Sequence, residues 1–312
     1  PSPTPPRNPA TSSAVPATPS SAGTPTARPV RQPTLGYYDS RLLLTATPAT
    51  AVPSPVPALA FEKGVVNILL LGSDKENGGS YRTDTMIVMS VNKESGAVAL
   101  LSVPRDLFVY IPQWTMQRIN AADNHGRAVE YPGGGPNLLA QTLLYNFGIP
   151  IHYYARINFD GFKQVVDLLG GIDIPVTCAL DDYVLKDPAL DPYKDENWEP
   201  YTVPIGIQHM DGASALLYAR LRQSYRGYTA LPAPTRPVDD FDRAHRQQQM
   251  LRAIFHKVLS LDLLPQIPAL FSQYSSIVET DMGLGDVLQF VPLAARLDNL
   301  SIKSRFISQY YT

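Results

Sequence analysis

The sequence predicts an α/β protein, with one three-layer α/β/α domain around a mixed β-sheet that follows a disordered Pro-rich linker. Three observations predict this architecture. Apolar runs of strand length alternate with segments of helical periodicity from residue 65 onward. The hydrophobic content of 44% over 312 residues is enough for a sizeable core. The prolines are concentrated at the start of the chain, which marks that start as a separate region.

The N-terminal region is too polar and too rich in proline to fold. Residues 1–57 contain 14 of the 30 prolines and five charged residues, so they offer little apolar surface to bury. We therefore predict a disordered linker over residues 1–60 and a catalytic domain over residues 61–312. The Ser/Thr/Pro mixture is typical of a spacer that holds a domain away from a surface. A disordered tail without a task is the alternative.

The first half of the domain is predicted to be mostly strands. VVNILLL, TMIVMSV and AVALLSV read as buried strands, and residues 92–96 form a hairpin between the last two. Start and stop signals predict helices at residues 136–147 and 161–169, and the first of these is followed by Gly148. IPIHYYARINF, which lies between them, is predicted as a strand.

The second half is predicted to be mostly helical. The polar residues 181–204 are predicted as an irregular excursion, and Asp211 is predicted to cap the helix DGASALLYARLR. The remaining expected elements are a loop at 224–238, a long amphipathic helix at 240–260, helices at 266–278 and 284–297, and a strand at 301–308.

Composition and missing motifs exclude several classes of protein. The formal net charge of −2 does not suit a general nucleic-acid binder. The single cysteine, Cys178, excludes an internal disulfide, and its apolar neighbours predict an inert core thiol. No apolar run reaches the roughly 18 residues of a membrane helix. HExxH, GxSxG, CxxC and the P-loop motif are also absent.

The long helix changes character along one stripe. At 100° per residue, one side of its later turns carries the apolar residues Leu251, Ile254, Phe255 and Val258. Asp240, Arg243 and Gln247 continue this stripe toward the start of the helix. Buried charge is costly unless it is paired. The polar start of the helix therefore either protrudes into solvent or lines a polar pocket.

Arginines gather where predicted elements end. Arg105 follows a strand, Arg220 and Arg222 end the YARLR helix, and Arg243 and Arg246 begin the long helix. The planar guanidinium makes paired hydrogen bonds with phosphate oxygens and keeps its charge. Several converging arginines therefore indicate a site for a multiply charged anion, and salt bridges to exposed carboxylates are the alternative.

Two aspartates leave neighbouring strand ends. Asp74 and Asp84 are separated by the loop that holds Gly78 and Gly79, and they could meet across it. Mg²⁺ is usually held by one or two carboxylates together with phosphate oxygens of a substrate. We therefore predict that both aspartates bind Mg²⁺, with Mn²⁺ as the alternative ion. A simple turn-capping role for Asp84 is the competing interpretation.

The ordered motifs resemble the LytR-CpsA-Psr family of bacterial cell-envelope phosphotransferases. The matching segments are NILLLGSD, RTDTMIVMSVN, LLSVPRDLFVYIP, RINAAD, INFDGFKQVVDLLGGIDIPV, HMDGASALLYARLR and DFDRAHRQQQ. The resemblance implies an enzyme on the extracytoplasmic face of the membrane, anchored by an N-terminal helix that this chain lacks. It implies transfer of a glycopolymer from a polyprenyl-pyrophosphate carrier to peptidoglycan, through a phosphodiester.

The resemblance also implies residue roles. Asp74 and Asp84 match the metal-binding aspartates, with Arg82 between them. Asp84, Arg105 and Arg220 would be catalytic. The matched pyrophosphate-binding set is Arg82, Arg105, Arg118, Arg220, Arg222, Asp240, Arg243 and Gln247. Either aspartate could accept the proton of the attacking hydroxyl.

This sequence departs from the family pattern in two places. The loop between Arg222 and Asp240 is longer than the family pattern, and Asp123 stands where that pattern has an aromatic residue. Two alternatives to transfer remain open at the level of sequence. One is hydrolysis of the polyprenyl pyrophosphate by the same cluster, and the other is non-catalytic binding of phosphorylated wall polymer or lipid.

Overall fold

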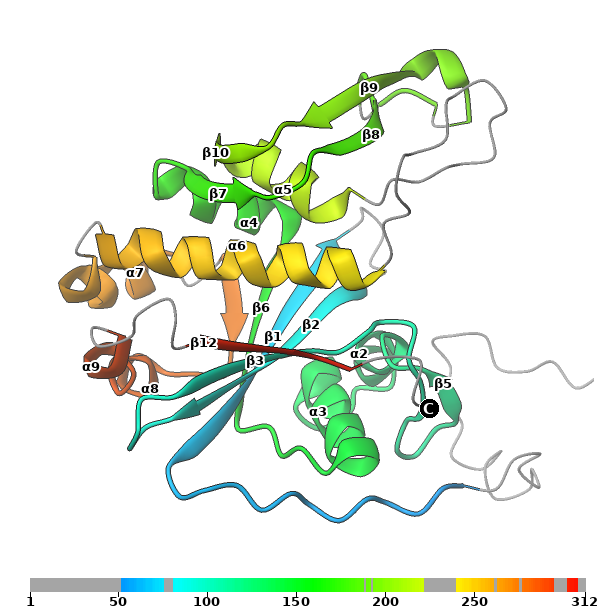
Figure 1. Cartoon of the computed structure of the whole chain (residues 1–312). Coiled ribbons are helices and arrows are strands. Elements are labelled where there is room, and N and C mark those ends of the chain that lie inside the picture. The colour runs from blue at the N-terminus through cyan, green and yellow to red at the C-terminus, as the bar shows by residue number, and fades with distance from the viewer. Residues whose placement is uncertain are drawn as a thin grey trace, which may run out of the picture. The chain divides into compact units, whose positions relative to one another are not determined.

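A mixed β-sheet is the centre of the computed structural model, which describes residues 52–75, 81–187, 189–191, 193–221, 240–260, 263–274, 277–294 and 302–307. Within these residues the sheet has six strands in the order β11-β6-β1-β2-β3-β12 (Figure 1). They are β1 (Val65–Lys75), β2 (Tyr81–Asn92), β3 (Val98–Ser102), β6 (Tyr153–Asn158), β11 (Val278–Thr280) and β12 (Ile302–Phe306).

The sheet mixes parallel and antiparallel pairs. β1, β2 and β3 form an antiparallel meander. β6 joins β1 in parallel, β12 joins β3 in parallel, and the short β11 runs antiparallel to β6 at the edge. The three sequence-predicted apolar strands are therefore the centre of the sheet, which confirms the predicted α/β class with a mixed sheet.

Helices cover both faces of this sheet (Figure 1). On one face, α2 (Ala121–Ala128) and α3 (Gly134–Phe147) pack against inward side chains of β1 and β2 such as Leu69 and Val88. On the other face, α6 (Asp240–Ser260) packs against Ile87 and Leu100 through its apolar stripe. Neighbouring strand residues point to opposite faces, so both faces are apolar and the strands read as continuous hydrophobic runs.

A further group of elements packs against α6, and its helix α4 (Phe159–Leu168) also contacts β1 and β6 of the sheet. The group comprises α4, β7 (Ile172–Val176), β10 (Gly206–Met210) and α5 (Gly212–Arg220). These elements share a buried cluster that includes Ile172, Ala215 and Met250 of α6. α4 and α5 begin at polar caps, because Asn158 accepts from Gly161 N at 2.7 Å and Asp211 accepts from Ser214 N at 2.8 Å.

The remaining elements are short. They are β4 (Phe108–Tyr110), β5 (Met116–Arg118), β8 (Leu180–Leu185), η1 (Asp195–Asn197), β9 (Trp198–Val203), η2 (Leu264–Gln266), α7 (Ile267–Tyr274), α8 (Leu284–Leu288) and α9 (Val291–Ala294). Among the described residues, no helix is long and apolar enough to cross a lipid bilayer.

Residues 52–60, at the end of the predicted linker, run extended beside the end of α3. Val56 N donates to Tyr145 O at 2.9 Å, and Leu59 N donates to Gly148 O at 2.8 Å. The Tyr145 hydroxyl donates to Pro53 O at 2.6 Å. Residues 1–51, and with them most of the predicted linker, lie outside the described residues, so its boundary at residue 60 stays a prediction.

Three predicted elements were wrong in form. Residues 181–204 are not irregular, because β8 and β9 pair from Leu180 with Val203 to Leu185 with Trp198. Each strand of this ribbon is an edge, which tolerates the proline and acidic residues that hid the strand pattern. The predicted helix 266–278 ends with α7, and its last residue, Val278, begins the edge strand β11.

The predicted helix 284–297 is two short helices, α8 and α9, in the part that the structure describes. Pro292 lies in the first turn of α9, where its missing N–H costs no helical hydrogen bond. Cys178 is also not a core thiol, since it is exposed in the turn between β7 and β8. The apolar run of β7 ends at Val176, before the cysteine.

Candidate functional site

The paired ends of β1 and β2 carry the two predicted metal-binding aspartates. Asp74 lies opposite Arg82 in the strand register, and a shift between Gly72 and Ser73 leaves Asp84 as an extra residue of β2. This β-bulge re-aims the side chain of Asp84 out of the regular alternation. A Cβ at Gly72 would lie 2.9 Å from the Cβ of Thr85, so glycine allows the strands to pair closely here.

Arg105, which follows β3, joins Asp84 to a chain of alternating charges. Its Nη1 lies 3.0 Å from Asp84 Oδ1, and its Nε lies 3.2 Å from Asp106 Oδ2. Asp106 Oδ1 in turn lies 3.1 Å from Arg118 Nη1. Arg105 is mostly buried, whereas 64% of the Arg118 side chain is exposed. The structure therefore brings Asp84, Arg105 and Arg118 into one cluster.

A buried network of hydrogen bonds lies next to this cluster and fixes the position of β2. Thr83, the neighbour of Asp84, donates its hydroxyl to Asp123 Oδ2, and Arg156 Nη2 donates to Asp123 Oδ1. Arg156 Nη1 also reaches both carboxylate oxygens of Glu279, at 3.2 and 3.1 Å. Thr83, Asp123 and Arg156 are at most 3% exposed. Because buried charges must be paired, this network ties α2, β6 and β11 to the strand that carries Asp84.

In the sequence, Asp123 stands out only as a departure from the family pattern, and no pattern singles out Arg156. Their pairing spans 33 positions, so no local pattern links them.

An apolar pocket of about 300 Å³ opens between the sheet and the helices α4, α5 and α6. Its walls include Leu71, Ile87, Phe162, Leu216, Met250, Leu251 and Ile254. Its polar lining includes Arg220 and Gln247, together with Gly72 and Thr85 from the strand ends. The pocket therefore runs from the strand ends, next to Asp84, into an apolar interior.

A second apolar cavity of about 850 Å³ adjoins the first. Both are lined by Ala155, Val165 and Val278, and the second continues past α7 with residues such as Leu270 and Phe271. We refer to these two neighbouring cavities together as the apolar passage, and their apolar walls suit a long hydrocarbon chain.

Of the three polar residues on the stripe of α6, the structure describes the side chains of Arg243 and Gln247, and neither is exposed. Arg243 is 7% exposed, and Gln247 lines the apolar pocket together with Leu251 and Ile254. Arg220 stacks its guanidinium on the ring of Phe159, with 4.6 Å to the ring centroid. The predicted residue Arg222 and the side chains of Arg82 and Asp240 lie outside what the structure describes.

The donor set at the strand ends suits a hard divalent ion. Asp74 and Asp84 offer carboxylate oxygens from adjacent strands, and the ion pair with Arg105 uses Oδ1 of Asp84. Among the described residues, no three His, Cys, Asp or Glu side chains form a metal-binding group. Mg²⁺ is commonly held by one or two carboxylates, with substrate phosphates and water as further ligands. The carboxylate oxygens of Asp74 and Asp84 are therefore donors of the type that Mg²⁺ takes.

Comparison with known proteins places this geometry in a family. The profile of the LytR_cpsA_psr family matches residues 46–309. The chain is 32% identical over 229 residues to the polyisoprenyl-teichoic acid–peptidoglycan teichoic acid transferase TagU of Oceanobacillus iheyensis, covering 73% of this chain and 62% of that protein. It is 28% identical to the regulatory protein MsrR of Staphylococcus aureus, covering 72% of this chain and 59% of that protein.

Solved structures agree with the sequence match. TagV of Bacillus subtilis superposes with a TM-score of 0.58 at 26% identity, covering 80% of this chain and 86% of that one. TagT bound to LIIa-WTA superposes with a TM-score of 0.56 at 25% identity, covering 82% and 84%. The curated relatives are longer, and the chain spans about three fifths of their length. The family match and the shared fold together show that this chain belongs to the LytR_cpsA_psr family.

Proposed function

We propose that this chain is the catalytic domain of a phosphotransferase that moves a glycopolymer from a polyprenyl-pyrophosphate carrier to peptidoglycan. The observation that carries the proposal is the apolar passage whose polar end holds Arg220 and Gln247 beside the strand ends. Such a site can bury a polyprenyl tail and hold its diphosphate at the same time. The names of the TagU relatives, which describe transfer of teichoic acid to peptidoglycan, support the same reaction.

The chemistry follows from the charges around the strand ends. A hydroxyl oxygen of the peptidoglycan attacks the glycan-side phosphorus and forms a new P–O bond. The bond from that phosphorus to the bridging oxygen breaks, and polyprenyl phosphate leaves with the bond's electron pair. The hydroxyl proton passes to a carboxylate, Asp74 or Asp84. Arg105 and Arg220 would stabilise the negative charge that develops on the phosphate oxygens.

The metal and the location belong to the proposal. Asp74 and Asp84 would hold Mg²⁺, which when bound would neutralise charge on the diphosphate. The domain would work outside the cell at the membrane surface, where both the lipid carrier and the peptidoglycan are found. The N-terminal anchor that the resemblance implies is part of this expectation.

The test is an assay of the purified chain with a polyprenyl-pyrophosphate-linked oligosaccharide and soluble peptidoglycan oligomers. Polyprenyl phosphate and a joined phosphodiester product are expected in equal amounts. The substitution Asp84→Asn should lower turnover by roughly 10²- to 10³-fold, because it removes a charge from the reacting centre. Asp160→Asn, a matched change at a side chain that is 79% exposed on α4, should leave turnover within about twofold of wild type.

The outcomes separate the alternatives. Release of polyprenyl phosphate without a joined product would support a hydrolase. Tight binding of the lipid without any turnover would support a non-catalytic binder. Turnover that is unchanged by a chelator would overturn the metal assignment and leave the transferase assignment in place.

A further inference from the structure

The second cavity of the apolar passage reaches the protein surface beside η2 and α7. Leu168 of α4 lines this cavity and is 53% exposed, and Gln266 of η2 lines it at another exposed position. The cavity therefore opens to the outside at this place. We call the exposed residues here the α7 rim, which consists of Leu168 together with the exposed residues of η2 and α7, namely Pro265, Gln266, Pro268, Ala269 and Ser272.

This opening lies far from the polar end of the passage. Gln247 of α6 lines the polar end, whereas Val258 of the same helix lines the second cavity. The two positions are separated by about 16 Å along an α-helix. Figure 1 shows α7 beside the C-terminal end of α6, while the ends of β1 and β2 that carry the aspartates lie toward its N-terminal end. A chain bound at the polar end therefore runs along α6 toward the α7 rim.

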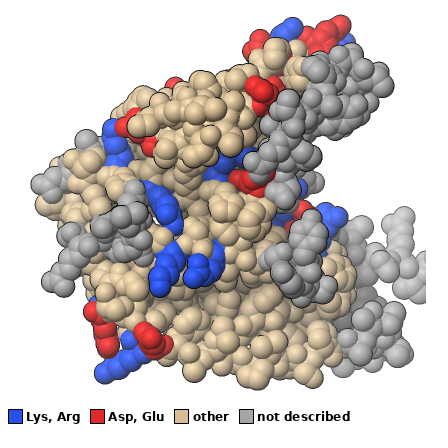
Figure 2. All heavy atoms as spheres, in the orientation of Figure 1, with Lys and Arg blue, Asp and Glu red and all other residues tan. Residues whose placement is uncertain are grey.

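The segment that contains η2 and α7 carries no charge. Residues 263–278 contain no Asp, Glu, Lys, Arg or His, although 17% of the whole chain is charged. In Figure 2 the blue and red atoms accordingly lie elsewhere, and the described atoms at the place of α7 are tan. Among the described residues that line the second cavity, the charged one is Glu279, and Arg156 pairs with it at 3.1 Å. The surface around the opening is therefore neutral.

The apolar side of α7 faces the cavity without closing it. Ile267, Leu270 and Phe271 recur at helical spacing and line the cavity, and each of them is only half-buried. Ala269 and Ser272, three positions apart on the same helix, are exposed. Contact between water and so many apolar side chains is unfavourable. The opening is therefore more stable against an apolar medium than against water.

We propose that the α7 rim rests on the lipid bilayer, and that the carrier's polyprenyl chain continues from the passage into the bilayer through this opening. This inference rests on the proposed function, which puts the polyprenyl chain in the passage. A chain that leaves the passage at this end enters either water or lipid, and its hydrocarbon strongly favours lipid.

The composition of the α7 rim favours lipid over a protein partner. Protein interfaces are enriched in aromatic residues and arginine, and the rim has neither. A bilayer needs no matching hydrogen bonds, so a neutral surface of leucine, proline, alanine, glutamine and serine is sufficient for a shallow contact. In this orientation the diphosphate stays at the other end of the passage, where the acceptor hydroxyl can reach it from the side away from the membrane.

The first experiment detects bilayer contact without catalysis. Cys178 is the single cysteine, so the full chain with Cys178→Ser and Ala269→Cys can be labelled at one place with the polarity-sensitive dye NBD. The matched control carries Cys178→Ser and Ile207→Cys, since Ile207 is 77% exposed on β10 and lines neither cavity. With excess phosphatidylcholine vesicles, the dye at position 269 should brighten and shift to shorter wavelength, while the dye at position 207 should not change.

Three results would overturn the proposal. An unchanged spectrum at position 269 would show that the α7 rim does not meet the bilayer. An equal change at both positions would show that the contact with lipid is not specific to the rim. A change at position 269 that needs no vesicles and grows with protein concentration would assign the rim to contact with a second copy of the chain.

The second experiment compares turnover of a long-chain substrate in phosphatidylcholine vesicles with turnover of a short-chain, water-soluble analogue. Ala269→Glu/Ser272→Glu should raise the KM for the vesicle substrate by at least about fivefold, because carboxylates resist transfer into an apolar medium. It should leave the KM for the soluble analogue within about twofold of wild type. The charge-matched control Ile205→Glu/Ile207→Glu, at two exposed positions near and on β10, should behave as wild type with both substrates.

The two experiments separate this inference from the proposed function. If wild type turns over neither substrate, the proposed function fails, while the dye at position 269 still decides the bilayer contact. If the rim variant raises the KM equally for both substrates, or the control variant raises it as much, the bilayer contact fails and the transferase assignment remains.

Discussion

Arg105 acts through geometry as much as through charge. It contacts Asp84 through Nη1 and Asp106 through Nε, so one planar fork spans two carboxylates. Ion pairs with this degree of exposure stabilise a fold by only about 0–1 kcal/mol. The main effect of the arrangement is therefore to fix the Asp84 carboxylate and to keep a cation beside the predicted phosphate position.

Replacing Arg105 by lysine tests this role. Lysine keeps the positive charge but has no fork to span both aspartates. We expect Arg105→Lys to lower kcat/KM for the lipid-linked substrate by at least about tenfold, while the free energy of unfolding changes by less than about 1 kcal/mol. Urea unfolding and the transfer assay measure the two quantities. A kcat/KM of the Arg105→Lys variant equal to that of wild type would show that a positive charge at this position is enough for turnover.

His125 gives a prediction about pH. It is 5% exposed in α2 and stacks on Trp114 at 3.8 Å between ring centroids, and burial lowers its pKa below the usual 6.5. The unfolded chain therefore binds this proton at a higher pH than the folded chain does. The contribution to stability should be constant above about pH 6.5 and should decrease as the pH falls below it.

The measurement compares urea unfolding at pH 7.5 and pH 5.5 for wild type and His125→Gln. Wild type should lose more stability between the two values than the variant does. An equal loss in both proteins would assign the pH dependence to other groups.

At the level of elements, the network of Thr83, Asp123 and Arg156 couples β2 to α2 and β6. Each donor or acceptor in it is buried, so removal of one partner leaves another unsatisfied at a cost of about 1–3 kcal/mol. Because Thr83 is next to Asp84, a disturbed network should also displace the site.

Thr83→Val keeps the shape of the side chain and removes the hydroxyl that donates to Asp123. We expect a loss of stability of about 1–3 kcal/mol and a lower kcat with little change in KM. Thr83→Ser, which keeps the hydroxyl, should restore kcat. If the Thr83→Val variant and the wild-type protein have equal kcat at a temperature where both are folded, the network has only a structural role.

The start of α5 gives a second prediction at this scale. The Asp211 carboxylate accepts from Ser214 N, and this backbone bond lowers its pKa. Asp211→Ala should destabilise the protein by about 1 kcal/mol, whereas Asp211→Ser should retain most of the cap. The folded pKa is depressed, so the stabilisation is present above about pH 4 and is lost as the pH falls through the folded pKa. Thermal unfolding at pH 7 and pH 3 measures both effects.

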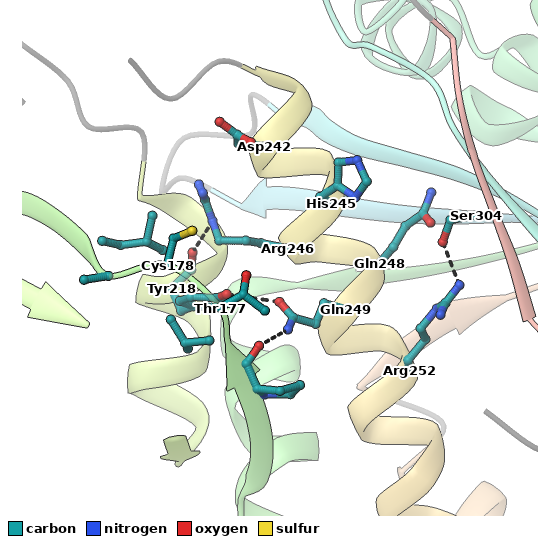
Figure 3. A pocket seen from close by; sticks show the side chains of 14 residues that line it. Thr177, Cys178, Tyr218, Asp242, His245, Arg246, Gln248, Gln249, Arg252 and Ser304 are labelled. Carbon is teal, nitrogen blue, oxygen red and sulfur yellow. Dashed lines mark hydrogen bonds between the residues drawn. The ribbon is translucent and has the colours of Figure 1, made fainter. Parts of the chain in front are cut away.

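At the scale of the whole molecule, α6 lies between two cavities and lines each with different residues. Its inner side closes the apolar passage over the sheet, and its outer side, together with residues 175–180, lines a separate cavity of about 430 Å³ (Figure 3). The helix also covers the edge strand β12, since Gln248 donates to Arg305 O and Arg252 donates to Ile302 O. These bonds tie α6 to the backbone of β12.

Filling the apolar passage tests its proposed role. Ala219 is 8% exposed on α5 and lines the pocket, so Ala219→Leu should occupy space meant for the lipid. We expect a higher KM for the polyprenyl-linked substrate and a stability cost of about 1–3 kcal/mol. Ala213→Leu, at an exposed position of the same helix, is the control. Unchanged KM in a folded Ala219→Leu protein would place the lipid elsewhere.

The sequence alone determined the central strands, the long helix and its apolar face, and the Asp211 cap of α5. These features are local, because side-chain periodicity records which side of an element is buried and a cap needs only its next few residues. The ordered motifs also indicated the family, and they drew attention to Asp84, Arg105 and Arg118, which the structure brings together through ion pairs.

Only the tertiary structure decided how distant segments combine. The bulge at Asp84, the Asp123–Arg156 pair and the edge strand β11 depend on which strands and helices become neighbours. The same is true of the two cavities on either side of α6. Such features come from packing between segments that are far apart along the chain, and the free energy of packing is recorded in no single stretch of sequence.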